Sequence, residues 1–307
     1  MNAKICIVVP ACNESGNILP LFTALQNVLA PLQYEWNLLW VDDGSKDDTL
    51  PTIKKLAGQH PQVQYLSLYR NFGHQNALKA GLDFADADAI ISMDADLQHP
   101  PDLVPALLAQ WEAGYDVVYT IRKDHKELPM LKRKTSNLFY NVLNSLSDID
   151  LEQGTADFRL MDRKVADTFR NFKETELFIR GLISWMGFKQ IGIEYEPGSR
   201  VDGKSKYTVK KMVRFALQGI TSFSTKPLYI ATYLGLVFSL VSVLYIPYII
   251  IAEISGVAVP GWASVIATIA FFGGLQLMIL GIIGLYLGKL FMQSKQRPHY
   301  IIKESQL

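Results

Sequence analysis

The stretch that decides the fold is Ile90-Ile91-Ser92-Met93-Asp94-Ala95-Asp96-Leu97-Gln98-His99-Pro100-Pro101. A short apolar run ends there in two carboxylates, and two prolines then prevent the strand from continuing. In an α/β sheet, ligands bind outside the carboxyl ends of the strands. Carboxylates with an amide oxygen close by are the hard ligands that Mg²⁺ or Mn²⁺ prefers. The stretch therefore predicts a divalent cation bound by Asp94, Asp96 and Gln98. The alternative is that both carboxylates are solvated turn residues before a helix that begins near Pro101.

Apolar strands and amphipathic helices alternate on both sides of this stretch. The apolar runs predict strands at 5–9, 37–41, 63–68, 89–93 and 117–120. The intervening segments predict helices at 17–29, 76–85 and 101–113, with another helix beginning at 47–49. This alternation favours an α/β fold with a doubly wound, mainly parallel sheet. Polar loops follow the carboxyl ends of several strands, so we expect polar side chains to lie together at one edge of the sheet.

After residue 120 the pattern becomes irregular. A basic cluster precedes an apolar-faced helix at 130–146, and a loop at Gly154 enters a short strand. Two further helices are expected at 165–172 and 176–186. The segment 189–196 alternates polar and apolar residues, as an edge strand does.

The last third of the chain has the composition of a membrane protein. Residues 206–223 are amphipathic and basic, typical of a helix on an anionic membrane surface, although an ordinary surface helix is the alternative. Residues 228–252 carry no charge, and residues 262–287 form a second uncharged run, each long enough for a hydrocarbon core of about 30 Å. Basic residues flank only the outer ends of these runs, which by the positive-inside rule places both termini in the cytoplasm.

The sequence therefore divides into four parts. We expect a cytoplasmic catalytic domain at 1–205, an amphipathic membrane-surface helix at 206–226, two transmembrane helices at 227–291 and a cytoplasmic tail at 292–307. The expected location is the inner (cytoplasmic) membrane, with a multi-pass anchor. The pair Gly284 and Gly288 and the basic tail leave room for a homo-oligomer.

Composition and motif spacing exclude several classes of protein. A formal net charge of +1 argues against nucleic acid as a partner, and two cysteines give no disulfide framework. No Gly-x-Gly occurs, so a dinucleotide fingerprint is absent. Residues 198–205 match the spacing of a phosphate-binding P-loop, but no buried strand precedes them and no strand ending in Asp follows.

Three motifs together resemble the inverting family 2 glycosyltransferases with a GT-A fold. They are Val8-Val9-Pro10-Ala11-Cys12-Asn13-Glu14, Val41-Asp42-Asp43-Gly44-Ser45-Lys46-Asp47-Asp48-Thr49 and Asp94-Ala95-Asp96-Leu97-Gln98. Three more segments resemble the branch that transfers a sugar to a polyprenyl phosphate, which includes dolichyl-phosphate mannose synthases and bactoprenol glucosyltransferases. These segments are Arg70-Asn71-Phe72-Gly73, Asp157-Phe158-Arg159-Leu160 and Arg200 through Gly203-Lys204-Ser205-Lys206-Tyr207. His99 departs from the pattern, since members often carry Asp there.

The resemblance implies a role for each motif. The nucleotide sugar would be bound by Pro10, Ala11, Asn13, Glu14, Asp42, Asp43 and Asp94, with Arg200, Lys204 and Lys206 on the diphosphate. Asp157 would be the catalytic residue, acting as a base or orienting the acceptor. Because a phosphate monoester is already mostly dianionic at neutral pH, positioning is the larger expected part.

An anionic acceptor also needs cations. Candidates beside the apolar-faced helix are Arg122, Lys132, Arg133 and Lys134. The expected reaction is inverting transfer of a sugar, first of all from UDP-glucose, to undecaprenyl phosphate. GDP-mannose or a modified UDP-sugar remains open as the donor. Less favoured alternatives are a processive polysaccharide synthase, whose Arg-Trp acceptor pair is missing, and a membrane scaffold that binds nucleotide sugars without catalysis.

Overall fold

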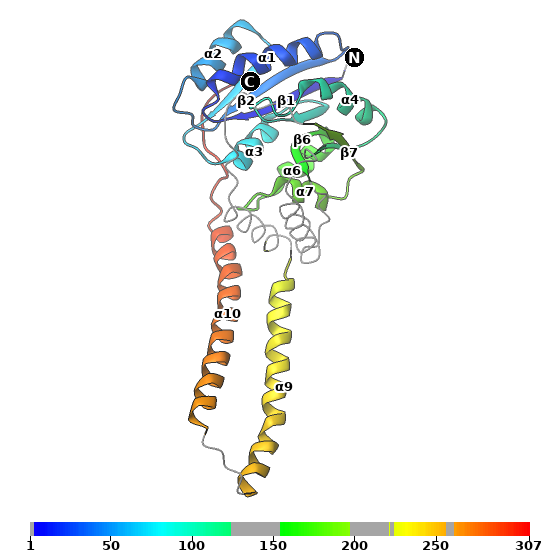
Figure 1. Ribbon diagram of the computed structural model, residues 1–307. Helices are drawn as coiled ribbons and strands as arrows, with labels where there is room; N and C mark the ends of the chain where they lie inside the picture. The colour runs from blue at the N-terminus through cyan, green and yellow to red at the C-terminus, as the bar shows by residue number, and fades with distance from the viewer. Residues whose placement is uncertain (1–2, 124–153, 197–220, 222–223, 256–260) are drawn as a thin grey trace.

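The structure is a computed structural model of the 307-residue chain, and it describes residues 3–123, 154–196, 221, 224–255 and 261–307. The strands in this part of the chain are β1 (Lys4–Ala11), β2 (Glu35–Asp42), β3 (Val63–Leu68), β4 (Ala89–Ser92), β5 (Val117–Arg122), β6 (Thr155–Asp162), β7 (Gln190–Tyr195) and β8 (Ile302–Gln306). They form one sheet in the order β7-β5-β6-β4-β1-β2-β3-β8 (Figure 1).

The pairing of these strands confirms the predicted doubly wound sheet. Strands β4, β1, β2 and β3 run parallel to one another, and β7 runs parallel to β5 at the edge. Strand β6 is antiparallel to both of its neighbours, β4 and β5. Because β6 runs in the opposite direction, its first residues lie at the same edge of the sheet as the carboxyl end of β4.

Helices cover both faces of the sheet. They are α1 (Ser15–Leu29), α2 (Thr49–Gln59), α3 (His74–Phe84), the 3₁₀ turn η1 (Pro101–Leu103), α4 (Val104–Glu112), α6 (Arg163–Arg170) and α7 (Ile179–Trp185). Alternate residues of β1 point to opposite cores: Ile5 and Ile7 pack with α1, α2 and α4, whereas Cys6 and Val8 pack with α3, α6 and α7. Burial on both faces explains why this strand reads as a continuous apolar run.

Two long apolar helices extend away from the sheet and lie side by side (Figure 1). They are α9 (Lys226–Ile254) and α10 (Trp262–Ser294). By length and composition each could cross a membrane, over Lys226–Ala252 and Ser264–Ser294, as the sequence predicts. Their large apolar side chains are exposed along most of their length, although Phe238 of α9 contacts Phe271 and Phe272 of α10.

The C-terminal residues return to the sheet, which the sequence analysis missed. Strand β8 pairs antiparallel with β3, and the hydroxyl of Tyr300 donates a hydrogen bond to Asp83 at 2.8 Å. The segment expected to be a plain tail is therefore the outer edge strand of the sheet. Its five residues are mostly polar, which is why no strand pattern is visible in the sequence.

Candidate active site

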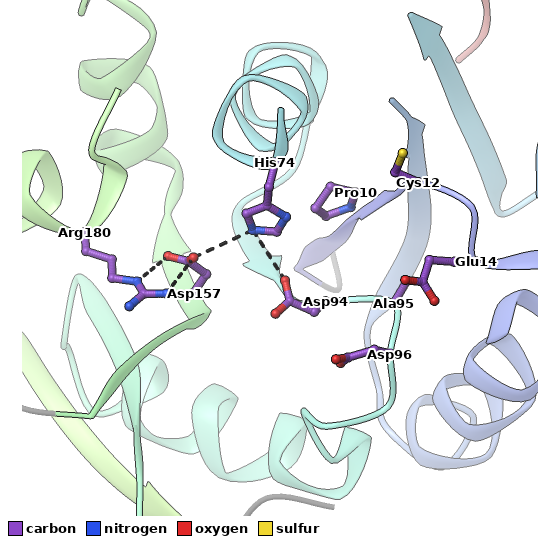
Figure 2. Close-up of a pocket in the computed structure, with 9 residues that line it drawn as sticks. All are labelled: Pro10, Cys12, Glu14, His74, Asp94, Ala95, Asp96, Asp157 and Arg180. Carbon is purple, nitrogen blue, oxygen red and sulfur yellow. Dashed lines mark hydrogen bonds and ion pairs between the residues drawn. The ribbon is translucent and has the colours of Figure 1, made fainter. Parts of the chain in front are cut away.

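A cavity of about 340 Å³ lies at the edge of the sheet where β1, β4 and β6 bring their polar ends together (Figure 2). Its lining residues are Pro10, Cys12, Glu14, His74, Asp94, Ala95, Asp96, Asp157 and Arg180. The loop after β1, the turn after β4, the start of β6, the start of α3 and helix α7 all contribute. The structure thus brings together carboxylates that lie more than 60 residues apart in the sequence.

Asp94 carries an unsatisfied buried oxygen. Its Oδ1 atom has no hydrogen-bond partner among the described residues, although the His74 Nε2 atom approaches it to 3.4 Å. The backbone N–H of Asp94 donates to Nδ1 of His99 at 2.9 Å, which fixes the turn that carries the carboxylate. The Asp94 side chain is 37% exposed, and its ion pairs with His74 and His99 are long, at 3.4 and 3.7 Å. The oxygen that lacks a hydrogen bond is therefore available to a ligand in the cavity.

Asp96 lines the same cavity, but Gln98 does not. The backbone N–H of Gln98 donates to Oδ1 of Asp96 at 3.2 Å, across a turn in which Leu97 has φ +60°. The amide oxygen of Gln98 lies 3.5 Å from Nη1 of Arg122. Among the described residues no group of three or more His, Cys, Asp or Glu side chains is placed to hold a metal ion. Two carboxylates are nevertheless sufficient protein ligands for Mg²⁺ when phosphate oxygens and water complete its shell.

Asp157 is buried and surrounded by cationic groups. Arg180 donates to both of its oxygens, from Nε at 2.7 Å and from Nη2 at 2.8 Å (Figure 2). His74 Nε2 lies 3.7 Å from Oδ2, and Arg159 Nη2 lies 3.7 Å from Oδ1. Burial alone would raise the pKa of Asp157, but Arg180, His74 and Arg159 hold it well below its usual range. The carboxylate therefore stays ionised.

Three residues around Asp157 did not emerge as site residues from the sequence. Gln75 donates to Asp157 at 3.3 Å and accepts from the backbone N–H of Ile179 at 3.1 Å, so it joins α3 to α7 beside the cavity. Burial lowers the pKa of His74, but Asp157 and Asp94 raise it above its ordinary value. The only sequence signal for His74 and Gln75 was their position directly after the Arg70–Gly73 motif, and Arg180 had none.

The end of β1 and the loop after it contain residues that line the cavity and residues that hold loops together. Pro10 and Glu14 line the cavity, and burial raises the pKa of Glu14. Ala11 is buried at the end of the strand, opposite Asp42. Asn13 instead fastens two loops together: its backbone N–H donates to Ser45 at 3.0 Å, and its side-chain oxygen accepts from the backbone N–H of Lys46 at 2.9 Å.

Asp42 and Asp43 are buried after β2 and are engaged by the protein itself. Asp42 accepts hydrogen bonds from the hydroxyl of Ser67 at 2.9 Å and from the backbone N–H of Ser45 at 3.1 Å. Asp43 accepts from the backbone N–H groups of Phe72 at 2.7 Å and Gly73 at 3.0 Å. Neither carboxylate lines the cavity. Both therefore shape the loops around it.

Comparison with known proteins shows the family. The model of "Glycosyl transferase family 2" matches residues 6–170. The chain is a member of glycosyl transferase family 2.

Two relatives of this glycosyltransferase match it over nearly the full length of both chains. It is 41% identical to the "Uncharacterized glycosyltransferase YkcC" of Bacillus subtilis, over 97% of this chain and 93% of that one. It is 42% identical to the "Bactoprenol glucosyl transferase" of Shigella phage SfV, over 98% of both chains.

A solved structure supports the fold of the glycosyltransferase. The mannosyltransferase PcManGT from Pyrobaculum calidifontis, solved with GDP-Man and Mn²⁺, is similar with a TM-score of 0.51 and 16% identity. The similarity covers 96% of this chain and 87% of that one. The fold is therefore GT-A-like, with a mixed sheet followed by two long apolar helices.

The predicted cationic residues of this glycosyltransferase lie mostly outside the described part. Arg122 is exposed at the end of β5 and approaches Gln98. The other predicted phosphate-binding residues are outside the described residues, as are the helix predicted at 130–146 and nearly all of the one at 206–223. Those residues are Lys132, Arg133, Lys134, Arg200, Lys204 and Lys206.

Proposed function

We propose that this enzyme transfers glucose from UDP-glucose to bactoprenol (undecaprenyl) phosphate at the cytoplasmic face of a membrane. The observation that carries the proposal is the 42% identity with a bactoprenol glucosyl transferase over 98% of both chains. That match includes the sheet, the cavity and both apolar helices. The products are a lipid-linked sugar and UDP, with the configuration at the sugar inverted.

In this proposal Asp94 and Asp96 hold a divalent cation, Mg²⁺ or Mn²⁺, against the diphosphate of the donor. The unsatisfied Oδ1 of Asp94 inside the cavity supports this assignment. A bound cation would neutralise the charge that develops on the departing diphosphate, as a Lewis acid. Gln98 supports the turn that presents both carboxylates.

Asp157 acts as a fixed negative charge in this proposal. Its low pKa makes it a weak proton acceptor, and the acceptor phosphate is mostly dianionic without its help. We infer that Asp157 orients the acceptor and stabilises positive charge that develops on the sugar ring. Arg180 and Gln75 hold it in place for this task.

The remaining assignments follow the order of the motifs. Pro10, Ala11, Asn13 and Glu14 would shape the nucleoside pocket, and Asp42 and Asp43 would fix its loops. Arg200, Lys204 and Lys206 would close over the diphosphate. The lipid phosphate would be received by Arg122, Lys132, Arg133 and Lys134. Both termini and the catalytic domain would lie in the cytoplasm, and α9 and α10 would cross the membrane.

The proposal is tested with the purified full chain in detergent. UDP-glucose, GDP-mannose and UDP-N-acetylglucosamine are each supplied with Mn²⁺ and undecaprenyl phosphate, and both lipid-linked sugar and released nucleoside diphosphate are measured. The expected result is a glucosyl lipid, formed only when UDP-glucose, metal and lipid are all present. Transfer from GDP-mannose alone would overturn the donor assignment. Nucleotide-sugar binding without turnover on any donor would overturn the enzymatic proposal.

A further inference from the structure

A second cavity, of about 600 Å³, lies at the end of α10 that is nearest to the sheet domain. We call it the basic groove. Its lining residues are Lys173, Thr175, Leu290, Gln293, Ser294, Gln296, Arg297, Pro298 and His299. None of them lines the candidate active site. The groove therefore belongs to a different part of the molecule.

The wall of the groove is held together by hydrogen bonds between α10 and the segment that connects α6 to α7. The side-chain oxygen of Gln293 accepts from the backbone N–H of Thr175 at 2.7 Å and from its hydroxyl at 2.8 Å. The side-chain N–H₂ of Gln293 donates to the carbonyl of Lys173 at 2.8 Å. An ion pair between Lys289 and Glu176 at 2.9 Å adds to this contact. These contacts fix the wall of the groove in place.

The groove carries positive charge that the described residues do not neutralise. The side chains of Lys173 and Arg297 form no ion pair or hydrogen bond with any described residue. Lys295, next to the lining, lies 4.2 Å from the centre of the Phe291 ring. The carboxylates of Glu174 and Glu176 interact with Lys289, and Asp83 accepts a hydrogen bond from Tyr300 and faces His299. Two cations that line one groove without an ion pair attract an anion, and phosphate in particular.

The position of the groove identifies the source of that anion. The candidate membrane span Ser264–Ser294 ends among the lining residues. Leu290 and Phe291 expose 66% and 60% of their surface, so the helix is still apolar where the groove begins. A bilayer that contains α10 would place its phosphate headgroups at the level of Lys173 and Arg297, where basic residues attract anionic lipids.

We propose that the basic groove binds the phosphate headgroup of an anionic phospholipid from the leaflet that faces the catalytic domain. The proposal requires that α10 crosses a bilayer, and it does not require that the chain transfers a sugar. A bound lipid would connect the membrane to the segment that leads into α7. That helix begins at Ile179, whose N–H is bonded to Gln75, and carries Arg180 of the active site. Lipid binding would therefore fix one wall of the active-site cavity relative to the membrane.

The test measures lipid binding by the full chain in detergent, with native mass spectrometry during titration with phosphatidylglycerol or phosphatidylcholine. We expect the first phosphatidylglycerol to bind about tenfold or more tightly than phosphatidylcholine, because two cations face the headgroup. The double variant Lys173→Gln/Arg297→Gln should lose this preference. The charge-conserving variant Lys173→Arg/Arg297→Lys should keep it.

A matched control removes the same charge elsewhere. Lys55 on α2 and Lys303 on β8 are exposed and do not line the groove, so Lys55→Gln/Lys303→Gln should keep the preference. Thermal unfolding of each variant establishes that it is folded. Equal binding of both lipids by the unaltered chain, or an unaltered preference in Lys173→Gln/Arg297→Gln, would overturn the proposal. Displacement of phosphatidylglycerol by millimolar glycerol phosphate would also overturn it, because the occupant would then be a soluble phosphate.

Discussion

Two pairs of carboxylates lie at the carboxyl ends of β2 and β4, the two strands that flank β1 in this glycosyltransferase, and their surroundings differ. Asp42 and Asp43, after β2, accept four hydrogen bonds from Ser67 and three backbone N–H groups. Asp94 and Asp96, after β4, line a cavity, and one oxygen of Asp94 has no hydrogen-bond partner among the described residues. We call the first pair closed, because neither carboxylate lines the cavity, and the second pair open, because both carboxylates line it.

The difference teaches how to separate structural from functional carboxylates. A buried oxygen that the protein satisfies stabilises the loops that donate to it. A buried oxygen that the protein leaves unsatisfied costs stability, and such a cost is typical of a ligand site. The sequence motifs of the two pairs look alike, and only the donors around them distinguish their roles.

The largest effect is expected at the open pair. Asp94→Asn should lower the rate of sugar transfer by about 1000-fold, because the amide cannot neutralise or bind a cation as a carboxylate does. The melting temperature should change little, since the Asp94 side chain is partly exposed and its ion pairs with His74 and His99 are long. An Asp94→Asn variant that transfers sugar within tenfold of the unaltered rate would contradict the functional role of the open pair.

Asp157 is an intermediate case, because it faces the cavity but is held by Arg180. Arg180→Gln should reduce transfer at neutral pH by about 10- to 100-fold, and Arg180→Lys should restore part of it. In the unaltered chain the low pKa of Asp157 keeps it ionised, so its contribution to stability is present above the unfolded pKa and is lost only as the pH falls through the low folded pKa. Without Arg180, burial raises that pKa.

The measurement is the pH dependence of kcat/KM. We expect the acid limb of Arg180→Gln to lie at higher pH than that of the unaltered chain. Arg163 on α6 is exposed and pairs with Asp86, away from the cavity, so Arg163→Gln serves as the control and should leave the limb in place. An acid limb that does not move in Arg180→Gln would contradict the role assigned to this pair.

A smaller effect, on stability, is expected at the closed pair. Asp43→Asn should cost about 2 kcal/mol, because charge-assisted hydrogen bonds to the N–H groups of Phe72 and Gly73 are weakened. A loss of this size should lower the melting temperature of the full chain by roughly 4 to 8 °C. The control is Asp48→Asn, which removes an exposed carboxylate of the same loop. Equal melting temperatures for both variants would show that the hydrogen bonds of Asp43 do not stabilise the fold.

The smallest effect is expected from removing residues 301–307, which include β8. Glu304 lies opposite Ser67 in the strand register, and Ser67 donates a hydrogen bond to Asp42. The deletion should therefore weaken the support of the closed pair. We expect the melting temperature to fall by about 2 to 4 °C, with metal binding at Asp94 unchanged. Loss of metal binding in this truncation would mean that the Asp94/Asp96 pair depends on the Asp42/Asp43 pair.

The sequence predicted the fold because its strongest signals are local. Continuous apolar runs between amphipathic helices marked β1 to β5, and long uncharged runs marked α9 and α10. Strand β8 was missed, because it is short and polar and is stabilised by pairing with β3. Its existence depends on a contact between residues more than 230 positions apart, which no local pattern records.

The site was only partly predictable for the same reason. Asp94, Asp96 and Glu14 follow strands and Pro10 lies near the end of β1, and all four line the cavity. Arg180 and Gln75 act through pairing with Asp157 across the fold, so their roles appear only when β6, α3 and α7 are in place. The closed state of Asp43 also required the loop after β3, which supplies both of its donors.

The central claim is that the open pair binds a divalent cation together with a nucleoside diphosphate. Its most direct test is to measure Mn²⁺ binding to the purified full chain, with and without UDP, by electron paramagnetic resonance. We predict one Mn²⁺ per chain in the presence of UDP, about 100-fold weaker binding in Asp94→Asn/Asp96→Asn, and unchanged binding in Asp42→Asn. Mn²⁺ binding by the Asp94→Asn/Asp96→Asn variant with the affinity of the unaltered chain would contradict the account.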